Sequence, residues 1–330
     1  MASLTSLVEK RVGRNFIIFH PSDFSTASEV AFGHALKIAL QSKAKLDLMH
    51  VEPSLSSEKP GWLDFPGVRA TLTRWGVLPE GVARQEVAKV GLRVRKILKS
   101  STDPVETMLR HFQRFPPDLI VLATHQREGL DRWLHKAVAE PLARRSRAMT
   151  LFIPQGGRGF VSLDDGTVTL KRILMPFDHV PHPRTTLRRA FLLARGLDCE
   201  AGEFRLVHVG QPGTAPKIVL PEVPGWSCEI VVRQGEVVDQ ILEEETHWRP
   251  DLMVLTTQRP YGLCRCAAGK HNRACLAGRA LPGAHRSGDH KVILILQGHI
   301  TCYQEGTYQR RPLWGGGIIF YALHLCSIAA

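Results

Sequence analysis

Short apolar runs alternate with amphipathic stretches along most of the chain. The apolar runs are rich in Val, Ile, Leu and Phe, which is typical of strands that are buried on both faces. In the first half of the chain they lie at 15–19, 46–51, 92–98, 118–123 and 149–153. Helical spacing of apolar positions predicts helices at about 26–41, 104–115 and 130–147. Steady alternation of strand and helix predicts a parallel, doubly wound α/β sheet with helices on both faces.

The same pattern occurs twice. In the second half, apolar runs at 171–177, 204–209, 228–233 and 251–257 alternate with predicted helices at about 184–196 and 235–247. Each half opens with a strand that ends in Pro-x-Asp, at Asp23 and Asp178, and carries a later strand that starts with Asp-Leu, at Asp118 and Asp251. Because the repeat period is a whole domain, we predict two tandem domains, 1–154 and 170–262, joined by a glycine-rich linker at 155–169.

The candidate chemistry falls at one end of each predicted sheet, because ligands of such sheets bind beyond the carboxyl ends of the strands. Asp23, Asp178 and the residues after Leu122 and Leu255 are expected there.

Histidines at this end could in principle serve as bases. His125 follows a strand, and His20, His50 and Asp23 could lie near it. No nucleophile, base and orienting group occur together at a spacing typical of a hydrolase, and a lone histidine at a strand end is usually structural. We therefore predict no catalytic residues.

These motifs resemble the universal stress protein family in its tandem two-domain form. The resemblance rests on Pro21-Ser-Asp23-Phe-Ser25, on His50-Val51 and on the stretch from Asp118 to Ile153, and it covers nearly all of 14–154 and most of 170–262. It implies two Rossmann-like, adenine-nucleotide-hydrolase-like domains that associate through their last strands. It also implies a role in stress survival without an established chemical reaction.

Family members that bind ATP share a loop of the form Gly-x2-Gly-x9-Gly-Ser, whose glycines let backbone amides approach the phosphates. In the first domain these positions fall on Ala123, Gln126, Lys136 and Ala137, and in the second domain the first two fall on Thr256 and Arg259. Side chains at these positions block the backbone approach, so the resemblance implies a degenerate site. The alternative is that Gln126 and Lys136 contact phosphate through their side chains, with ATP or AMP as the ligand.

No cofactor is required in this interpretation. The candidate nucleotide positions are Pro21, Asp23, Val51, Leu122, Ala123, Gln126, Lys136, Ala137, Pro176, Asp178, Val209, Thr256 and Arg259.

The chain departs from the family pattern after Gly262. Acidic residues almost vanish, and five of the seven cysteines lie in 263–330. One interpretation is a zinc site formed by Cys264, Cys266, His271 and Cys275, but the one-residue gap between the first two cysteines is tight and no second pair follows. The favoured interpretation is a frameshift. Permitted codons read one nucleotide later give a string that starts Phe-Val-Gly-Ala-Leu-Arg-Glu and looks like the missing family helix and the start of its last strand.

A frameshift would truncate the second domain at 262 and make 263–330 an aberrant, poorly ordered tail. Without its last strand, the second domain would expose an apolar sheet edge, which invites aggregation or pairing with another chain. We therefore expect the second domain to be less stable than the first.

Charge and hydropathy limit the remaining partners. The net charge is +12, but the segment 263–330 contributes eight basic and two acidic residues, which is half of that excess. The cluster Arg144, Arg145 and Arg147 suits a helix end, so nucleic acid is not the expected partner. No signal peptide or membrane span is evident, and a cytoplasmic protein is the default.

The sequence thus predicts a universal stress response protein that is a ligand-sensing or partner-binding module rather than an enzyme. The two domains are expected to pack as an internal pseudo-dimer, with a homodimer and an unknown protein partner left open. The alternatives are a weak ATP or AMP hydrolase and a basic nucleic-acid-binding protein.

Overall fold

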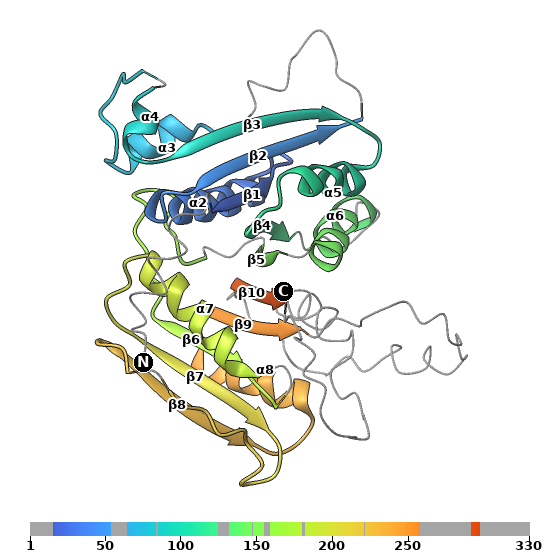
Figure 1. The fold of residues 1–330 in the computed structure, drawn as a ribbon, viewed down its shortest axis with the longest axis vertical. Helices are drawn as coiled ribbons and strands as arrows, with labels where there is room; N and C mark the ends of the chain where they lie inside the picture. The colour runs from blue at the N-terminus through green and yellow to red at the C-terminus, as the bar shows by residue number, and fades with distance from the viewer. Residues whose placement is uncertain are drawn as a thin grey trace, which may run out of the picture.

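The computed structural model describes residues 16–53, 65–83, 85–124, 132–146, 148–154, 159–179, 182–220, 222–257 and 292–297. Of residues 132–137, 140, 257 and 292–297 it describes the backbone alone. The strands form one sheet of ten in the order β3-β2-β1-β4-β5-β10-β9-β6-β7-β8 (Figure 1). We call the part from β1 to β5 the N-terminal half and the part from β6 to β10 the C-terminal half.

The N-terminal half follows the predicted alternation. Its strands are β1 (Ile17–Pro21), β2 (Lys45–Glu52), β3 (Arg93–Ser100), β4 (Leu119–Thr124) and β5 (Met149–Pro154). Its helices are α2 (Thr26–Gln41), α3 (Val68–Arg74), α4 (Glu86–Lys89), α5 (Pro104–Arg114) and α6 (Arg132–Arg145). The strand pairs of this half are parallel, so the predicted parallel α/β arrangement is confirmed here.

The C-terminal half repeats the strand order. Its strands are β6 (Arg172–Pro176), β7 (Gly202–Val209), β8 (Trp226–Arg233), β9 (Leu252–Thr257) and β10 (Val292–Gln297), and its helices are α7 (Pro183–Gly196) and α8 (Val237–Trp248). From the centre of the sheet outward, one half runs β5-β4-β1-β2-β3 and the other β10-β9-β6-β7-β8. The last strand of each half is therefore central, and the third strand of each half is at an outer edge.

β10 overturns one expectation from the sequence. We predicted that the loss of the last strand leaves the edge of β9 open, but Val292–Gln297, within the predicted tail, pairs with β9 in parallel along its length. Its other side pairs with β5 in antiparallel orientation, so the sheets of the two halves, each parallel within itself, join at this pair of strands. The other residues of 263–330 lie outside the described part of the chain, and the frameshift remains a prediction.

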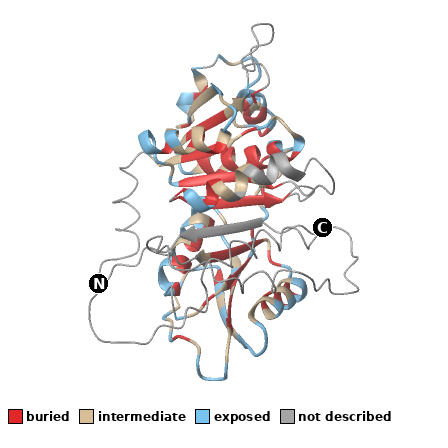
Figure 2. Ribbon diagram, turned by 90° about the vertical axis from the view of Figure 1, so that its right-hand side faces the viewer, coloured by how far each residue is buried: buried red, intermediate tan, exposed pale blue. Residues whose placement is uncertain are grey.

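Each face of the sheet has its own apolar core under a layer of helices (Figure 2). One core, which we call the α2/α7 face, includes buried residues of those two helices and of α3 and α4. The other, the α5/α8 face, includes buried residues of α5, α6 and α8. Both cores include strand residues of the two halves, among them residues of β1, β4, β5, β6 and β9.

Local side-chain contacts explain where several elements begin. Asp103 caps α5 by accepting a hydrogen bond from the N–H of Glu106 at 2.9 Å, and Pro104 follows at the first helical position. The repeated Asp-Leu motif is also structural. Asp118 accepts from the N–H of Ile17 at 3.0 Å, and Asp251 accepts from the N–H of Lys171 at 2.8 Å. These carboxylates tie β4 to β1 and β9 to β6 at their amino ends.

The predicted linker is packed on α2. Phe160 and Val161 are each 1% exposed, and Val161 forms a β-bridge with Val168. His34 Nε2 accepts from the N–H groups of Phe160 at 3.0 Å and Val161 at 3.2 Å, while its Nδ1 donates to the carbonyl of Val30 at 2.8 Å. Burial lowers the pKa of His34 to about 4, so the ring is neutral at pH 7 and fixes the path of the linker.

A buried carboxylate sits in the middle of β2. The side chain of Asp47 is fully buried and accepts from Arg95 Nε at 3.0 Å, with His111 Nε2 at 3.6 Å and Lys45 Nζ at 3.7 Å. The Arg95 guanidinium lies 4.1 Å from the centre of the Phe115 ring. Burial opposes ionisation of Asp47, but hydrogen bonds from His111 and Arg95 and the charges of Arg95 and Lys45 hold its pKa below the ordinary value.

The C-terminal half holds the same cluster with its charges reversed. Arg205 on β7 donates to Glu229 on β8 at 2.8 Å and to Glu244 on α8 at 2.8 Å, and its guanidinium lies 4.7 Å from the centre of the Trp248 ring. Arg205 stands three residues before His208, as Asp47 stands three before His50. The contact is therefore kept at equivalent positions while the sign of each charge is exchanged.

Candidate functional site

The candidate positions lie at carboxyl ends of strands. Because the two halves run in opposite directions, these positions fall into two groups at opposite ends of the strands. β5 is parallel to β4, and β10 is parallel to β9, but β5 and β10 are antiparallel to each other. The strands of the two halves therefore run in opposite directions. The carboxyl ends of β1, β2 and β4 lie together at one end of the strands, and those of β6, β7 and β9 lie together at the opposite end. Each half has its own candidate site.

In the N-terminal half, Asp23 closes the turn between β1 and α2. Its Oδ1 accepts from the N–H of Ser25 at 3.1 Å and from the Ser25 hydroxyl at 2.6 Å. The Ser25 hydroxyl oxygen in turn accepts from the N–H of Ser28 at 3.2 Å and caps α2. Pro21, before this turn, is half-buried. Asp23 thus has a structural task in the absence of any ligand.

Aromatic rings cover the turn. Phe24 has a left-handed backbone with φ of 63°, and its ring stacks on His50 with the ring centres 4.0 Å apart. His50 Nδ1 donates to the carbonyl of Ser22 at 2.7 Å, which fixes the imidazole against the turn. Phe65 packs on Phe24 edge-on at 5.4 Å. Val51, next to His50, packs against the α5/α8 face and is half-buried.

His20 is sealed in the core behind the turn. It is 0% exposed, and its Nδ1 donates to the carbonyl of Val121 at 3.0 Å, with Nε2 3.3 Å from the Ser28 hydroxyl. Burial lowers its pKa to about 4, against the opposing effects of the Val121 contact and the Asp23 charge. His20 and His50 therefore belong to the framework of the turn, while His125 lies outside the described residues.

The phosphate end of the first site is described in part. Leu122 is buried and Ala123 half-buried at the end of β4, so a methyl group occupies the first glycine position of the family loop. Thr124 follows, and its buried hydroxyl has no hydrogen-bond partner in the described part of the chain. Gln126 and the side chains of Lys136 and Ala137 lie outside the described residues. Sequence reasoning did not single out Thr124.

In the C-terminal half, the turn after β6 repeats the histidine contact. His208 Nδ1 donates to the carbonyl of Phe177 at 3.3 Å and lies 3.9 Å from Asp178 Oδ1, while His208 Nε2 lies 3.2 Å from the Thr214 hydroxyl. Asp178 Oδ1 also accepts from the N–H of His179 at 2.7 Å. Pro176, Asp178 and Val209 are half-buried. His208 thus takes the place of His50, an equivalence visible in the pairs His50-Val51 and His208-Val209.

Thr256, at the first glycine position of the second site, contacts α7. Its hydroxyl forms a short hydrogen bond with the hydroxyl of Thr186. The first turn of α7 therefore meets the end of β9 through these two side chains. Arg259 lies outside the described residues.

No group of metal-ligating side chains occurs in the described ranges, and the alternative zinc ligands Cys264, Cys266, His271 and Cys275 all lie outside them. Among the described helices, none has the length and apolar character needed to cross a membrane. Of the predicted basic cluster, Arg145 donates to Glu106 on α5 at 2.8 Å, so this arginine ties two helices together.

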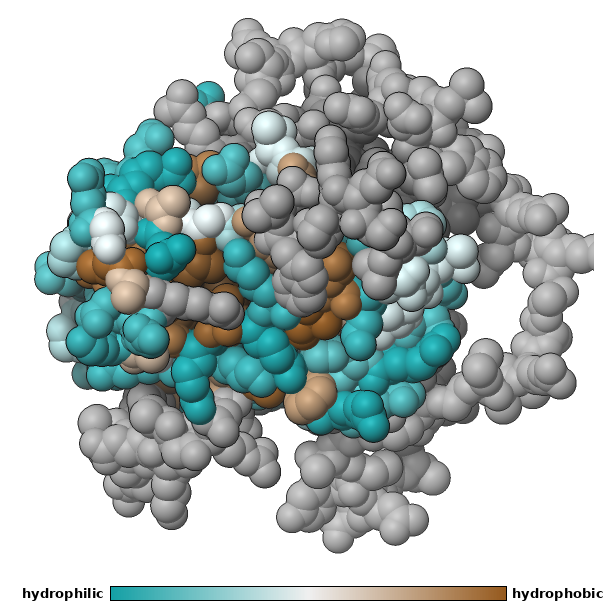
Figure 3. Space-filling model, turned by 90° about the horizontal axis from the view of Figure 1, so that it is seen from above, coloured by the Kyte–Doolittle hydropathy of each residue, from teal (hydrophilic) through white to brown (hydrophobic). Residues whose placement is uncertain are grey.

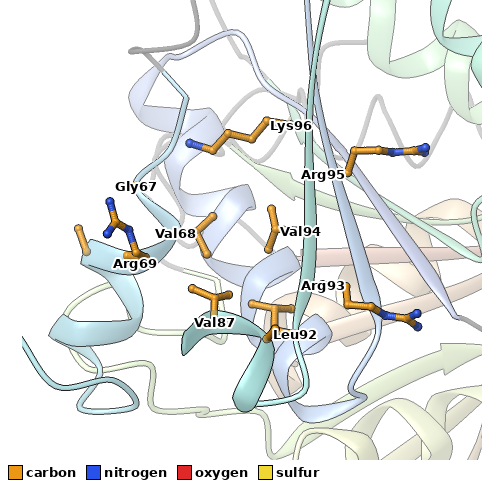
Figure 4. Close-up of a pocket in the computed structure, with 11 residues that line it drawn as sticks. Gly67, Val68, Arg69, Val87, Leu92, Arg93, Val94, Arg95 and Lys96 are labelled. Atoms are coloured by element: carbon orange, nitrogen blue, oxygen red, sulfur yellow. The ribbon is translucent and has the colours of Figure 1, made fainter. Parts of the chain in front are cut away.

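A separate hollow of about 950 Å³ lies between α3, α4 and β3 (Figure 4). Val68, Val87 and Leu92 are buried along it, and the side chains of Arg69 and Lys96 lie toward its rim. Seen from this end, the surface interleaves hydrophobic and hydrophilic side chains (Figure 3). An apolar floor with cations at the rim suits an anion that carries an apolar body. The lining is Gly67, Val68, Arg69, Ala70, Val87, Ala88, Leu92, Arg93, Val94, Arg95 and Lys96.

The sequence missed this hollow because α3 and α4 are short and carry no long apolar period. The hollow adjoins the first candidate site through Lys96, which lines it. Lys96 Nζ lies 5.5 Å from the centre of the Phe65 ring, and Phe65 packs on Phe24 in the Asp23 turn.

Several solved structures align with the chain. A universal stress protein from Archaeoglobus fulgidus DSM 4304 aligns at 13% identity and a TM-score of 0.48, over 86% of this chain and 99% of that one. A functionally unknown protein from Pseudomonas aeruginosa PAO1 aligns at 13% identity and 0.49, over 97% and 99%. A universal stress protein in complex with cAMP aligns at 20% identity and 0.28, over 42% and 97%.

No curated protein sequence matches the chain. The sequence profile of the universal stress protein family matches residues 17–154, from the first residue of β1 to the last of β5. This range contains the Asp23 turn, the His50 contact and the parallel β3-β2-β1-β4-β5 arrangement described above. Residues 17–154 form a domain of the universal stress protein family.

Proposed function

We propose that the whole chain is a tandem universal stress response protein that senses a ligand or binds a protein partner, with a degenerate adenine-nucleotide site in each half. The repeated strand order, the equivalent histidines His50 and His208 and the charge-reversed clusters around Asp47 and Arg205 support descent of both halves from one domain. The pairing of β5 with β10 supports an internal pseudo-dimer built on the last strands.

The observation that carries the degenerate site is the hydrogen bond between Thr186 and Thr256. A phosphate cradle needs backbone N–H groups that a ligand can approach closely. In the second half two side chains meet at that point, and in the first half Ala123 adds a methyl group there. We expect ATP and AMP to bind weakly in both halves and propose no reaction for the chain.

The basic-rimmed hollow beside α3 supports a ligand other than a nucleotide. Its buried valines and leucine would accept an apolar body, and Arg69 and Lys96 would face a negative group. We propose that the chain acts in the cytoplasm, that its partner is a protein, and that nucleic acid is not its partner, since Arg145 of the predicted basic cluster is paired with Glu106.

The test is mass spectrometry of small molecules released by denaturing freshly purified, undialysed protein. We expect no adenine nucleotide in stoichiometric amount. The Asp23→Ala and Asp178→Ala variants and the variant that combines them are the matched controls, because a trace that persists in the combined variant is not held by either candidate site. Stoichiometric ATP or AMP that disappears in one variant would overturn the proposal and locate a working site.

A further inference from the structure

The outer side of β8 is open in the part of the chain that the structure describes. β8 is the last strand of the sheet, at the lower edge in Figure 1. The carbonyls of Gly225 and Arg233 accept from Gly202 and Gly210 on the β7 side, so the odd-numbered residues of β8 direct their backbone groups toward β7. Because successive residues of a strand alternate, Cys228, Ile230 and Val232 direct their N–H and C=O groups outward.

The side chains along this edge are apolar on one face and charged on the other. Ile230 and Val232 are each 38% exposed, and because strand side chains alternate they share the α2/α7 side of the sheet with Trp226 and Cys228. On the α5/α8 side, the side chains of Glu229 and Arg233 are 60% and 48% exposed. Exposed β-branched residues on an open edge favour pairing with another strand.

Glu229 and Arg233 are the two ends of a chain of ion pairs. Glu229 accepts from Arg205 at 2.8 Å, Arg205 donates to Glu244 at 2.8 Å, and Glu244 accepts from Arg233 Nε at 3.0 Å. The charges alternate along it, so the chain of pairs has one negative end and one positive end. Both ends lie on the same face of the edge strand, four residues apart, and both retain exposed surface.

We propose that β8 pairs with β8 of a second copy of this chain in antiparallel orientation, about a two-fold axis at Val231. In this register Ile230 lies opposite Val232 of the second copy, and both are residues with outward backbone groups, so they form a hydrogen-bonded pair. On the other face Glu229 lies opposite Arg233 of the second copy. The ion pairs of the two copies then connect end to end into one closed network. The sheet continues from one copy into the next.

Neighbouring registers lack this complementarity. With the axis at Ile230, Glu229 would face Val231, and with the axis at Val232, Arg233 would face Val231. The opposite sheet edge is also unsuited to self-pairing, because β3 carries four basic residues and no acidic residue. Any two-fold register there opposes cations to cations or to neutral groups. The proposal therefore commits to β8 and to a closed dimer.

The register is tested by disulfide cross-linking of the full chain under mild oxidation. Residues 231 of the two copies form a non-hydrogen-bonded pair with Cα atoms about 4.5 Å apart, within the range of a disulfide. Val231→Cys is expected to give a covalent dimer at least about tenfold faster than Ser227→Cys, whose partners would be about 26 Å apart. The unmodified chain measures the background from its own cysteines. Equal rates for the two variants would overturn the register.

The partner is tested by charge exchange, with association measured by sedimentation velocity. Unmodified protein should be a dimer that dissociates on dilution. Arg233→Glu alone and Glu229→Arg alone oppose like charges across the axis, and each should weaken the dimer by about tenfold or more. An equimolar mixture of the two variants restores both opposed pairs and should recover the dimer, which a merely misfolded variant cannot do. A monomer at every concentration, an open polymer, or a mixture no stronger than its components would overturn the proposal.

Discussion

Removing the Arg95 guanidinium should destabilise the N-terminal half, because it leaves the Asp47 carboxylate buried with weaker partners. The side chain of Asp47 is fully buried, and after Arg95→Met it retains Lys45 at 3.7 Å and His111 at 3.6 Å. Loss of one partner of a buried ion pair costs about 3–5 kcal/mol. Arg95 is 30% exposed and Lys45 remains, so we expect a loss of about 2–3 kcal/mol in the free energy of unfolding.

The assay is urea unfolding at pH 7 followed by circular dichroism, with hydrogen exchange of β2 and β3 to locate the effect. A loss of 2–3 kcal/mol should move the midpoint by about 1 M urea. Lys99→Met is the matched control, since it makes the same kind of replacement at an exposed position of the same strand, and it should change stability by less than about 0.5 kcal/mol.

The pH dependence follows from the sign of the shift. The folded state lowers the pKa of Asp47, so its contribution is complete above about pH 4, the ordinary value for Asp, and is lost as the pH falls through the lower folded value. The difference between Arg95→Met and the unmodified protein should therefore be full at pH 7 and shrink below about pH 4. A difference under 0.5 kcal/mol at pH 7, or one equal to that of Lys99→Met, would refute the reasoning.

Two further changes test the packed linker, both by urea unfolding. His34→Leu leaves two buried backbone N–H groups without an acceptor and should cost about 2–4 kcal/mol. Because burial lowers the folded pKa of His34 and His20 to about 4, protonation favours the unfolded state, so stability should fall as the pH drops from 6.5 toward 4, less steeply in the variant. Gly166→Ala should cost about 1–3 kcal/mol more than Gly76→Ala, since both have positive φ but only the first would place a Cβ against Trp75; equal costs would contradict that contact.

The sequence predicted most of the fold because the decisive signals are local. Buried parallel strands are short apolar runs, and the longer helices have apolar positions at helical spacing, so the predicted strands and longer helices lie within a few residues of the observed ones. The helices α3 and α4 were missed because seven and four residues carry too little periodicity. These two helices shape the hollow beside β3, so that part of the surface was missed with them.

β10 shows the limit of reasoning from a family pattern. Val292–Gln297 has five apolar residues and one glutamine, a composition typical of a strand, but it lies within the segment 263–330, which departs from the family pattern and was predicted to be a poorly ordered tail. Val292–Gln297 forms a strand here because β5 and β9 each have a side whose backbone groups it can pair with. Local strand propensity does not show that such unpaired strand sides exist elsewhere in the fold.

For the candidate sites as well, the sequence predicts the positions of residues but not the contacts between them. Asp23, Val51, Asp178 and Val209 lie at strand ends as predicted, because topology alone puts them there. The contacts on which nucleotide binding or its loss depends join residues far apart in the sequence. Thr186 and Thr256 are 70 residues apart, and His208 and Phe177 are 31 residues apart. Such pairs follow from the packing of helices on strand ends, which no local pattern specifies.

The most direct test of the degenerate sites is a calorimetric titration of ATP into the full chain. The closed contact at Thr256 and the methyl group of Ala123 predict no saturable binding up to about 1 mM ATP. Saturable binding of one or two nucleotides per chain with a Kd of about 10 μM or tighter would contradict the account, because it would require a phosphate site that accepts these side chains.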